Sequence, residues 1–231
     1  MARKPSNGTP QLPSPTKTNR ERIIESLMAL LAEQPFEEIG FKEIAARAGL
    51  TLVQCREEFA STIAVLAAHM KEMDRKVLAE TDSEMAEEPP RERLFDVLMR
   101  RIEALAPHRA AIRSLMRSIS RNPGLAFAAN GLAVRSQQWM LTAADIDAAG
   151  PRGLIRAQGL AVLYARVLRV WLDDQDPGLA RTLAALDREL GRAQRWAGFL
   201  DDMYRFVPRC RRRARRRRYG GDGTREEPIV A

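Results

Sequence analysis

The chain has few of the residues that build cross-linked or catalytic sites. Its 231 residues include two cysteines, Cys55 and Cys210, and two histidines, His69 and His108. Two cysteines do not make a disulfide framework, and neither histidine has Cys, Asp or Glu neighbours at metal-ligand spacing. A Gly-rich phosphate loop and a nucleophile motif are also missing. We therefore expect neither an enzyme nor a site for a metal or another cofactor.

Long apolar runs are absent as well. No uncharged apolar stretch approaches the roughly 20 residues of a membrane-spanning helix. The segment from Met1 to Thr18 is polar and proline-rich, unlike the apolar centre of a secretory signal. Hydrophobic residues nevertheless make up 45% of the chain, which is enough to bury a core. These features predict a soluble protein of a reducing cytoplasm.

Positive charge is concentrated in one place. Eight arginines lie between residues 209 and 218, and without them the remaining 30 of the 38 basic residues equal the 30 acidic ones. The net charge of +8 therefore describes a tail, predicted to be disordered over residues 208–231, and not the body of the protein. Such a tail attracts polyanions by charge alone, either nucleic acid or an anionic membrane, or else it is solvated without a partner.

The apolar residues recur at helical spacing, and no alternating strand pattern is present. After an arm at residues 1–18, a helix is expected from Asn19 to Pro35, followed by helices at 42–48, 52–58 and 61–78. An acidic junction ending in two prolines separates these from helices at 91–106, 109–120, 125–144 and 154–173, with a break at Gly150-Pro151. Asp176-Pro177 is typical of the start of a last helix that reaches Tyr204. The pattern predicts an all-α protein with domains at 19–80 and 91–207.

Three short helices with a glycine turn before the third are typical of a helix-turn-helix, whose third helix can enter the DNA major groove. Here the turn is Gly49, and Thr51 can cap the helix that follows. The run FKEIAARAGLT at residues 41–51, followed by LVQCREEF at 52–59, resembles the DNA-binding region of the TetR/AcrR family of transcriptional regulators. The resemblance covers roughly residues 19–70.

This resemblance implies a set of DNA contacts. Gln54 would read an adenine edge and Arg56 would pair with a phosphate. The full expected set is Lys42, Arg47, Thr51, Leu52, Gln54 and Arg56. Glu57 and Glu58 depart from the family pattern, and would repel the DNA backbone if they faced it. The alternative is a folded helix-turn-helix that no longer binds DNA.

The family also implies a helical second domain that binds a small apolar effector and forms a homodimer, most often in a repressor. Large apolar side chains of residues 91–173 could line the effector pocket or simply pack the core; they are Phe95, Met99, Met116, Phe127, Trp139, Tyr164 and Trp171. A heptad-like seam in the last helix could form the dimer interface or pack within its own subunit. Its residues are Leu179, Leu183, Leu186, Leu190, Ala197 and Leu200.

A second resemblance suggests a different function. The stretch at residues 171–187, WLDDQDPGLARTLAALD, is similar to the end of the lipid-binding accessory family of ubiquinone biosynthesis, which shares the TetR fold without acting on DNA. It implies a protein that presents an isoprenoid lipid to a partner enzyme and keeps a vestigial helix-turn-helix. Sequence-specific DNA binding and a co-purifying lipid are the observations that distinguish the two functions.

Overall fold

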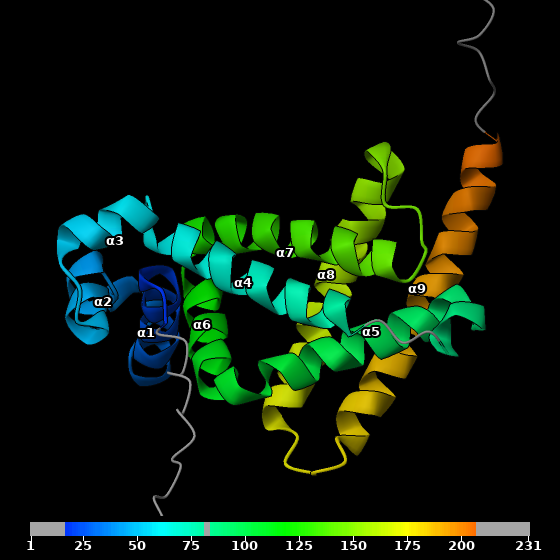
Figure 1. Ribbon diagram of the computed structural model, residues 1–231. Helices are drawn as coiled ribbons and strands as arrows, with labels where there is room; N and C mark the ends of the chain where they lie inside the picture. The colour runs from blue at the N-terminus through cyan, green and yellow to red at the C-terminus, as the bar shows by residue number, and fades with distance from the viewer. Residues whose placement is uncertain (1–16, 81–83, 207–231) are drawn as a thin grey trace, which may run out of the picture. The chain divides into compact units, whose positions relative to one another are not determined.

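A computed structural model describes residues 17–80 and 84–206, with the side chains of residues 84, 86 and 196–206 outside the description. Every regular element in this part of the chain is helical, which confirms the all-α prediction (Figure 1). The α-helices are α1 (Asn19–Glu33), α2 (Phe41–Ala48), α3 (Leu52–Glu58), α4 (Thr62–Ala79), α5 (Pro90–Leu105), α6 (Arg109–Arg121), α7 (Pro123–Ala143), α8 (Gly150–Asp173) and α9 (Ala180–Phe206). Short 3-10 turns lie at Phe36–Glu38, Glu84–Glu87 and Ala106–His108. The predicted arm before residue 17 and the arginine tail lie outside the described residues.

The first helix begins with a capping box. Thr18 Oγ1 accepts a hydrogen bond from the Glu21 amide at 3.2 Å, and a Glu21 carboxylate oxygen accepts one from the Thr18 amide at 2.8 Å. These two bonds satisfy donors that the first turn of a helix leaves free. The same bonds hold the pKa of Glu21 below its usual range. The helix begins at Asn19, as expected, and Thr18 is its cap.

The prediction that Asp176-Pro177 starts the last helix is wrong. Leu179 has a φ of 52°, in the left-handed region, and α9 begins at Ala180. Asp176 instead accepts hydrogen bonds from the amides of Gly178 and Ala180 within the turn. The predicted break at Gly150-Pro151 is likewise part of a helix. Gly150, with a φ of 63°, is the first residue of α8, and Pro151 lies in its first turn.

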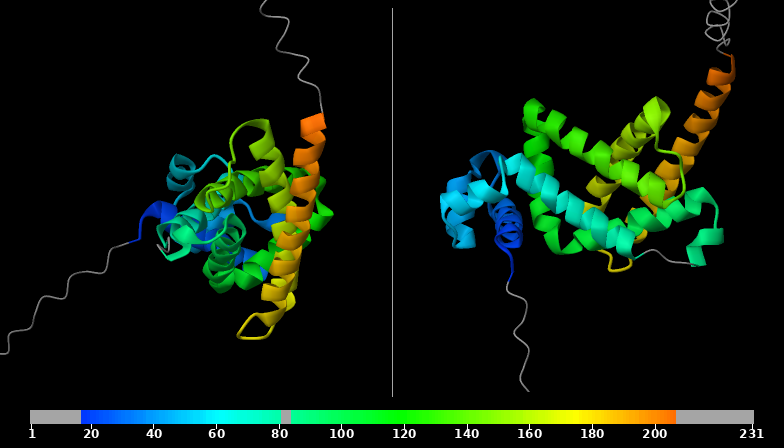
Figure 2. Two further views of the ribbon diagram at one scale, coloured as in Figure 1. Left: turned by 90° about the vertical axis from the view of Figure 1, so that its right-hand side faces the viewer. Right: turned by 45° about the horizontal axis from the view of Figure 1, so that its top comes forward.

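The described residues up to Leu190 form one compact unit, and the rest of α9 belongs to a second unit. In the first unit α4 leads from the three N-terminal helices into a bundle with α5, α7 and α8 (Figure 2). The helix α1 packs against α2, α3 and α4 and also against α6. The side chains that fill this core without exposure include Ile23, Leu27, Leu98 and Ile102. The N-terminal helices and the bundle therefore share packing and are not separate bodies.

Candidate nucleic-acid interface

A rigid turn joins α2 to α3. Gly49 ends α2 with a φ of 63°, and the Leu50 amide donates to the Ala45 carbonyl at 3.0 Å. Arg22 reaches from α1 to donate to the carbonyls of Ala48 and Gly49. A cation at the carboxyl end of a helix satisfies carbonyls that the helix leaves free. Arg22 therefore holds the end of α2, and with it the start of α3, against α1.

The helix α3 is short but fixed at both ends. Thr51 Oγ1 accepts from the Gln54 amide at 3.2 Å, and Gln54 Oε1 accepts from the Thr51 amide at 2.9 Å. Cys55 is fully buried and Phe59, which ends the helix, is 4% exposed. Burial raises the pKa of the Cys55 thiol. These contacts leave α3 little freedom to turn about its axis.

The opposite side of α3 is open and partly apolar. Leu52 is 56% exposed and Val53 is 68% exposed, although both are large hydrophobic residues. Arg56 and Glu57 are exposed on the same helix, and Lys42 is exposed on α2. Apolar side chains at the start of a recognition helix can contact thymine methyl groups. Val53 was not among the predicted contacts. The sequence does contain a signal for it, because Val53 follows Leu52 in a short helix whose buried position is Cys55.

Four of the predicted DNA contacts have polar partners inside the protein. Arg47 pairs with Glu33 of α1 through two hydrogen bonds, one of 2.6 Å. Gln54 uses its amide oxygen in the cap of α3, so only its NH₂ group is left to donate. Arg56 donates to the Ala60 carbonyl at 3.3 Å. The Thr51 hydroxyl is occupied in the same cap. Lys42 and Leu52 are therefore the exposed members of the predicted set with no hydrogen bond or ion pair among the described side chains.

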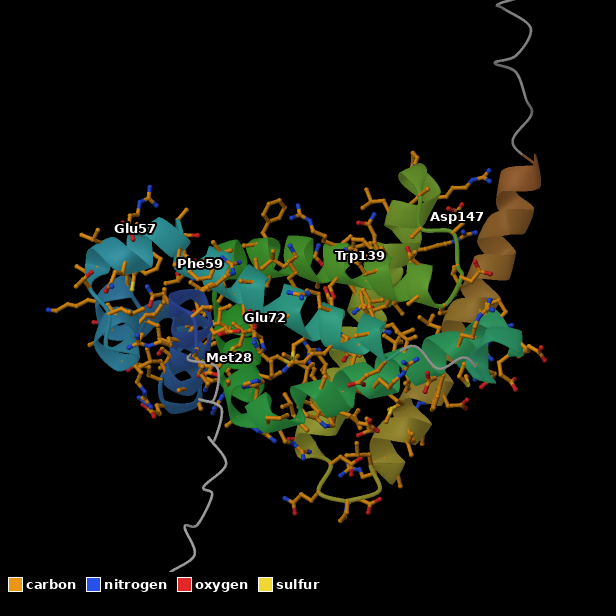
Figure 3. The ribbon with its side chains drawn as sticks, viewed as in Figure 1. Met28, Glu57, Phe59, Glu72, Trp139 and Asp147 are labelled. Carbon is orange, nitrogen blue, oxygen red and sulfur yellow. The ribbon has the colours of Figure 1, made fainter. Side chains whose placement is uncertain are left out.

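The two acidic residues of α3 lie in different places. A Glu58 carboxylate oxygen is 4.0 Å from an Arg20 guanidinium nitrogen of α1, and that guanidinium lies 4.5 Å from the centre of the Phe59 ring. Glu57 stays on the exposed side of α3 (Figure 3). The charge of Glu58 is therefore balanced within the subunit, while that of Glu57 is presented to a partner.

The seven side chains predicted to line an effector pocket do not surround one hollow. Met99, Tyr164 and Trp171 are buried in the core, where Arg109 lies 5.1 Å over the Trp171 ring. Phe95 and Met116 are partly buried against it. Phe127 is 84% exposed, and Trp139, at 55%, lines a groove beside α4. Core packing accounts for most of this set.

The described part of the predicted dimer seam packs within its own subunit. Leu186 and Leu190 are buried in the core, and Leu179 and Leu183 lie partly buried against it. The side chains of Ala197 and Leu200 lie outside the described residues. A stripe on α8 is exposed instead, where Ile155 and Val162 flank Gly159 at spacings of four and three residues.

In the described part of the chain, no helix combines the length and apolar character needed to cross a membrane. No group of three or more His, Cys, Asp or Glu side chains among those residues could hold a metal ion.

No protein-family model and no curated protein sequence matches the chain. Solved structures do. A TetR transcriptional regulator from Nitrosomonas europaea is 22% identical, with a TM-score of 0.60 over 77% of this chain and 99% of that one. A TetR transcriptional regulator from Rhodococcus sp. RHA1 is 21% identical, with a TM-score of 0.54 over 76% and 95%. These matches, together with the geometry of α1 to α4, show that the chain has the fold of the TetR transcriptional regulators.

Proposed function

We propose that this chain is a DNA-binding transcriptional regulator that places α3 in the major groove. The observation that carries the proposal is the open side of α3, where Leu52 and Val53 are exposed on a helix held by Arg22, Thr51 and Cys55. Exposed apolar residues on a rigid helix lose little conformational freedom on binding. The regulator fold of the structural neighbours supports the same function.

Binding to the DNA backbone rests on a small number of charges. Lys42 and Arg56 supply cations near α3, while Glu57 opposes them. The affinity of residues 19–190 for DNA should therefore depend only moderately on salt concentration. The slope of log affinity against log salt concentration follows the number of phosphates that the protein neutralises. Sequence preference then comes from base contacts by Leu52, Val53 and the NH₂ group of Gln54.

In this proposal the regulator acts as a homodimer in the cytoplasm, as a repressor released by a small ligand. Two copies related by a two-fold axis match a palindromic operator. Because the described leucines of α9 are occupied in the core, the exposed stripe of Ile155, Gly159 and Val162 on α8 is the surface offered to a second copy. The lipid-accessory alternative shares the fold and gains no support from the structural neighbours.

The test is selection of binding sites from a random duplex library by the full chain, with competitor DNA in excess to occupy the arginine tail. We expect an enriched palindrome, bound about a thousandfold more tightly than scrambled DNA. Val53→Ala should weaken the preference at one base step, whereas Arg56→Ala should weaken all duplexes alike. Arg117→Ala, on an exposed part of α6, is the control. Enrichment of no motif, or variants indistinguishable from the control, would refute the proposal.

A further inference from the structure

A groove of about 740 Å³ lies between α4 and α7, outside the set of residues predicted to bind a ligand except for Trp139. On α4 its wall follows one stripe, from Ala64, Ala67 and Ala68 to Leu78. The three alanines have short side chains, which leave room along this side of α4. The volume lies within the range of small-molecule sites, which is roughly 300–1,000 Å³.

The groove has an apolar body between aromatic ends. Leu132 and Met70 add to the alanine surface of its wall. Phe59 lies at the end beside α3, and Trp139 at the opposite end, along α7 (Figure 3). A ligand that fills it therefore needs an extended apolar part.

The rim of the groove carries unbalanced positive charge. Its two acidic residues already have cationic partners, because Glu58 lies beside Arg20 and Asp74 is bound to Arg101. Lys71 and Arg75, one turn apart on α4, and Arg135, opposite them on α7, have no ion pair within the described residues. Three cations around an apolar hollow complement a ligand that joins an apolar body to an anionic group.

We propose that the groove between α4 and α7 binds a small amphipathic anion, such as a medium-chain carboxylate, held by Arg75, Arg135 and Lys71. Its apolar chain lies on Ala64, Ala67 and Met70, between Phe59 and Trp139. The ligand is a free small molecule, since the hollow lies between two helices and ends at aromatic side chains. As the effector site of a regulator, the groove rests on the function proposed above; as a binding site, it does not.

The position of the groove gives it a route to the DNA-binding helices. The helix α4 begins three residues after Phe59, which ends α3, and both Phe59 and α4 line the groove. At the floor, Asp74 of α4 accepts a hydrogen bond from Ser136 of α7 at 2.7 Å. An anion between α4 and α7 lies against both helices and favours whichever separation fits it. If the anion binds one separation of α4 and α7 more tightly than another, it shifts the equilibrium towards that separation, and α3 shifts with α4.

The test is calorimetric titration of the full chain with decanoate, and with decylammonium as a probe of equal length and opposite charge. We expect decanoate to bind and decylammonium to show no heat of binding. Arg135→Gln and Arg75→Gln should each weaken decanoate about tenfold, as expected for loss of a charge-assisted contact. Arg169→Gln leaves the groove intact and keeps the arginine-rich tail, so it should bind decanoate like the unaltered chain. Ala67→Leu, which fills the hollow, should weaken decanoate while the melting temperature stays within a few degrees.

Equal binding of the two probes, or unchanged decanoate binding in Arg135→Gln and Ala67→Leu, would overturn the site. The regulatory part is tested separately, by the affinity of the full chain for its selected DNA with and without decanoate. Specific DNA binding that decanoate leaves unchanged would overturn the effector role. Groove binding without any specific DNA binding would uphold the site and refute the proposed function instead.

Discussion

Asp74 on α4 and Arg101 on α5 form an ion pair in the core, with side chains that are 10% and 4% exposed. Ser136 on α7 adds a hydrogen bond of 2.7 Å to the same carboxylate oxygen. Three helices thus meet at one carboxylate, and the Arg101 guanidinium also lies 5.8 Å over the Tyr164 ring of α8. Removing one partner leaves a buried charge without compensation, which typically costs about 3–5 kcal/mol.

We therefore expect Asp74→Ala to lower the free energy of unfolding by about 3–5 kcal/mol in urea titrations. The exposed pair of Lys17 and Glu25, at 60% and 53% exposure, is the control, and Lys17→Gln should cost less than about 1 kcal/mol. Replacing both core partners, as Asp74→Leu with Arg101→Met, should recover part of the loss. A loss of less than about 1 kcal/mol for Asp74→Ala would mean that the pair is not buried in solution.

The buried His69 predicts a loss of stability in mild acid. Burial, with the positive charges of His108, Lys76 and Arg101 nearby, lowers the pKa of His69 to about 3, against 6.5 for an unperturbed histidine. In the unfolded chain His69 therefore takes up a proton near pH 6.5, whereas in the folded chain it stays neutral until the pH approaches 3. Stability is complete above pH 6.5 and falls as the pH drops from there towards 3, by about 2 kcal/mol between pH 7 and 5.

His69→Leu removes this proton uptake and should flatten that part of the stability curve, measured by urea unfolding at several pH values. His108, whose ring centre is 4.8 Å from that of His69, also has a pKa lowered mainly by burial, so a smaller slope should remain. An unchanged slope in His69→Leu would assign the acid sensitivity to other groups.

Two glycines in neighbouring helices should respond oppositely to alanine. A Cβ on Gly153 of α8 would overlap the backbone of Ala148, so Gly153→Ala must displace the loop before α8. We expect a loss of at least about 2 kcal/mol in urea titration. Gly131 of α7 has open space where a Cβ would lie, and Gly131→Ala should stabilise by up to about 1 kcal/mol through helix propensity. Equal effects at both positions would contradict the packing of the loop on α8.

The proposed dimer predicts that a charge on α8 separates the subunits. Val162→Asp places a carboxylate on the exposed stripe beside Gly159, where Val162 is 45% exposed. The dissociation constant, measured by light scattering over a concentration series, should rise at least tenfold with the helical circular dichroism unchanged. Phe127→Asp, on the 84% exposed ring of α7, is the comparison. If Phe127→Asp separates the subunits and Val162→Asp does not, the interface lies on α7.

Much of the fold follows from the sequence. Apolar spacing and breakers determined the helices, because a helix must bury one stripe of its surface. Gly49 and Thr51 marked the turn and the cap before α3, since left-handed backbone favours glycine and a helix start needs an acceptor. The start of α9 was misplaced because Leu179 adopts a positive φ, which local preference does not specify for a leucine. The start of α8 was placed too late because Gly150-Pro151 can either break a helix or open one.

The partners of the site residues were decided only by tertiary structure. Nothing in the local sequence says that Arg47 meets Glu33, that Glu58 lies by Arg20, or that Asp74 meets Arg101, because these pairs join residues from different helices. The same holds for the groove, which is lined by three alanines of α4 together with Leu132 and Arg135 of α7. The spacing of apolar residues and the positions of the helix breakers are local, so they indicate which surfaces must be buried and where the chain turns. Only the packing of the helices decided which charges stay free to meet DNA or a ligand.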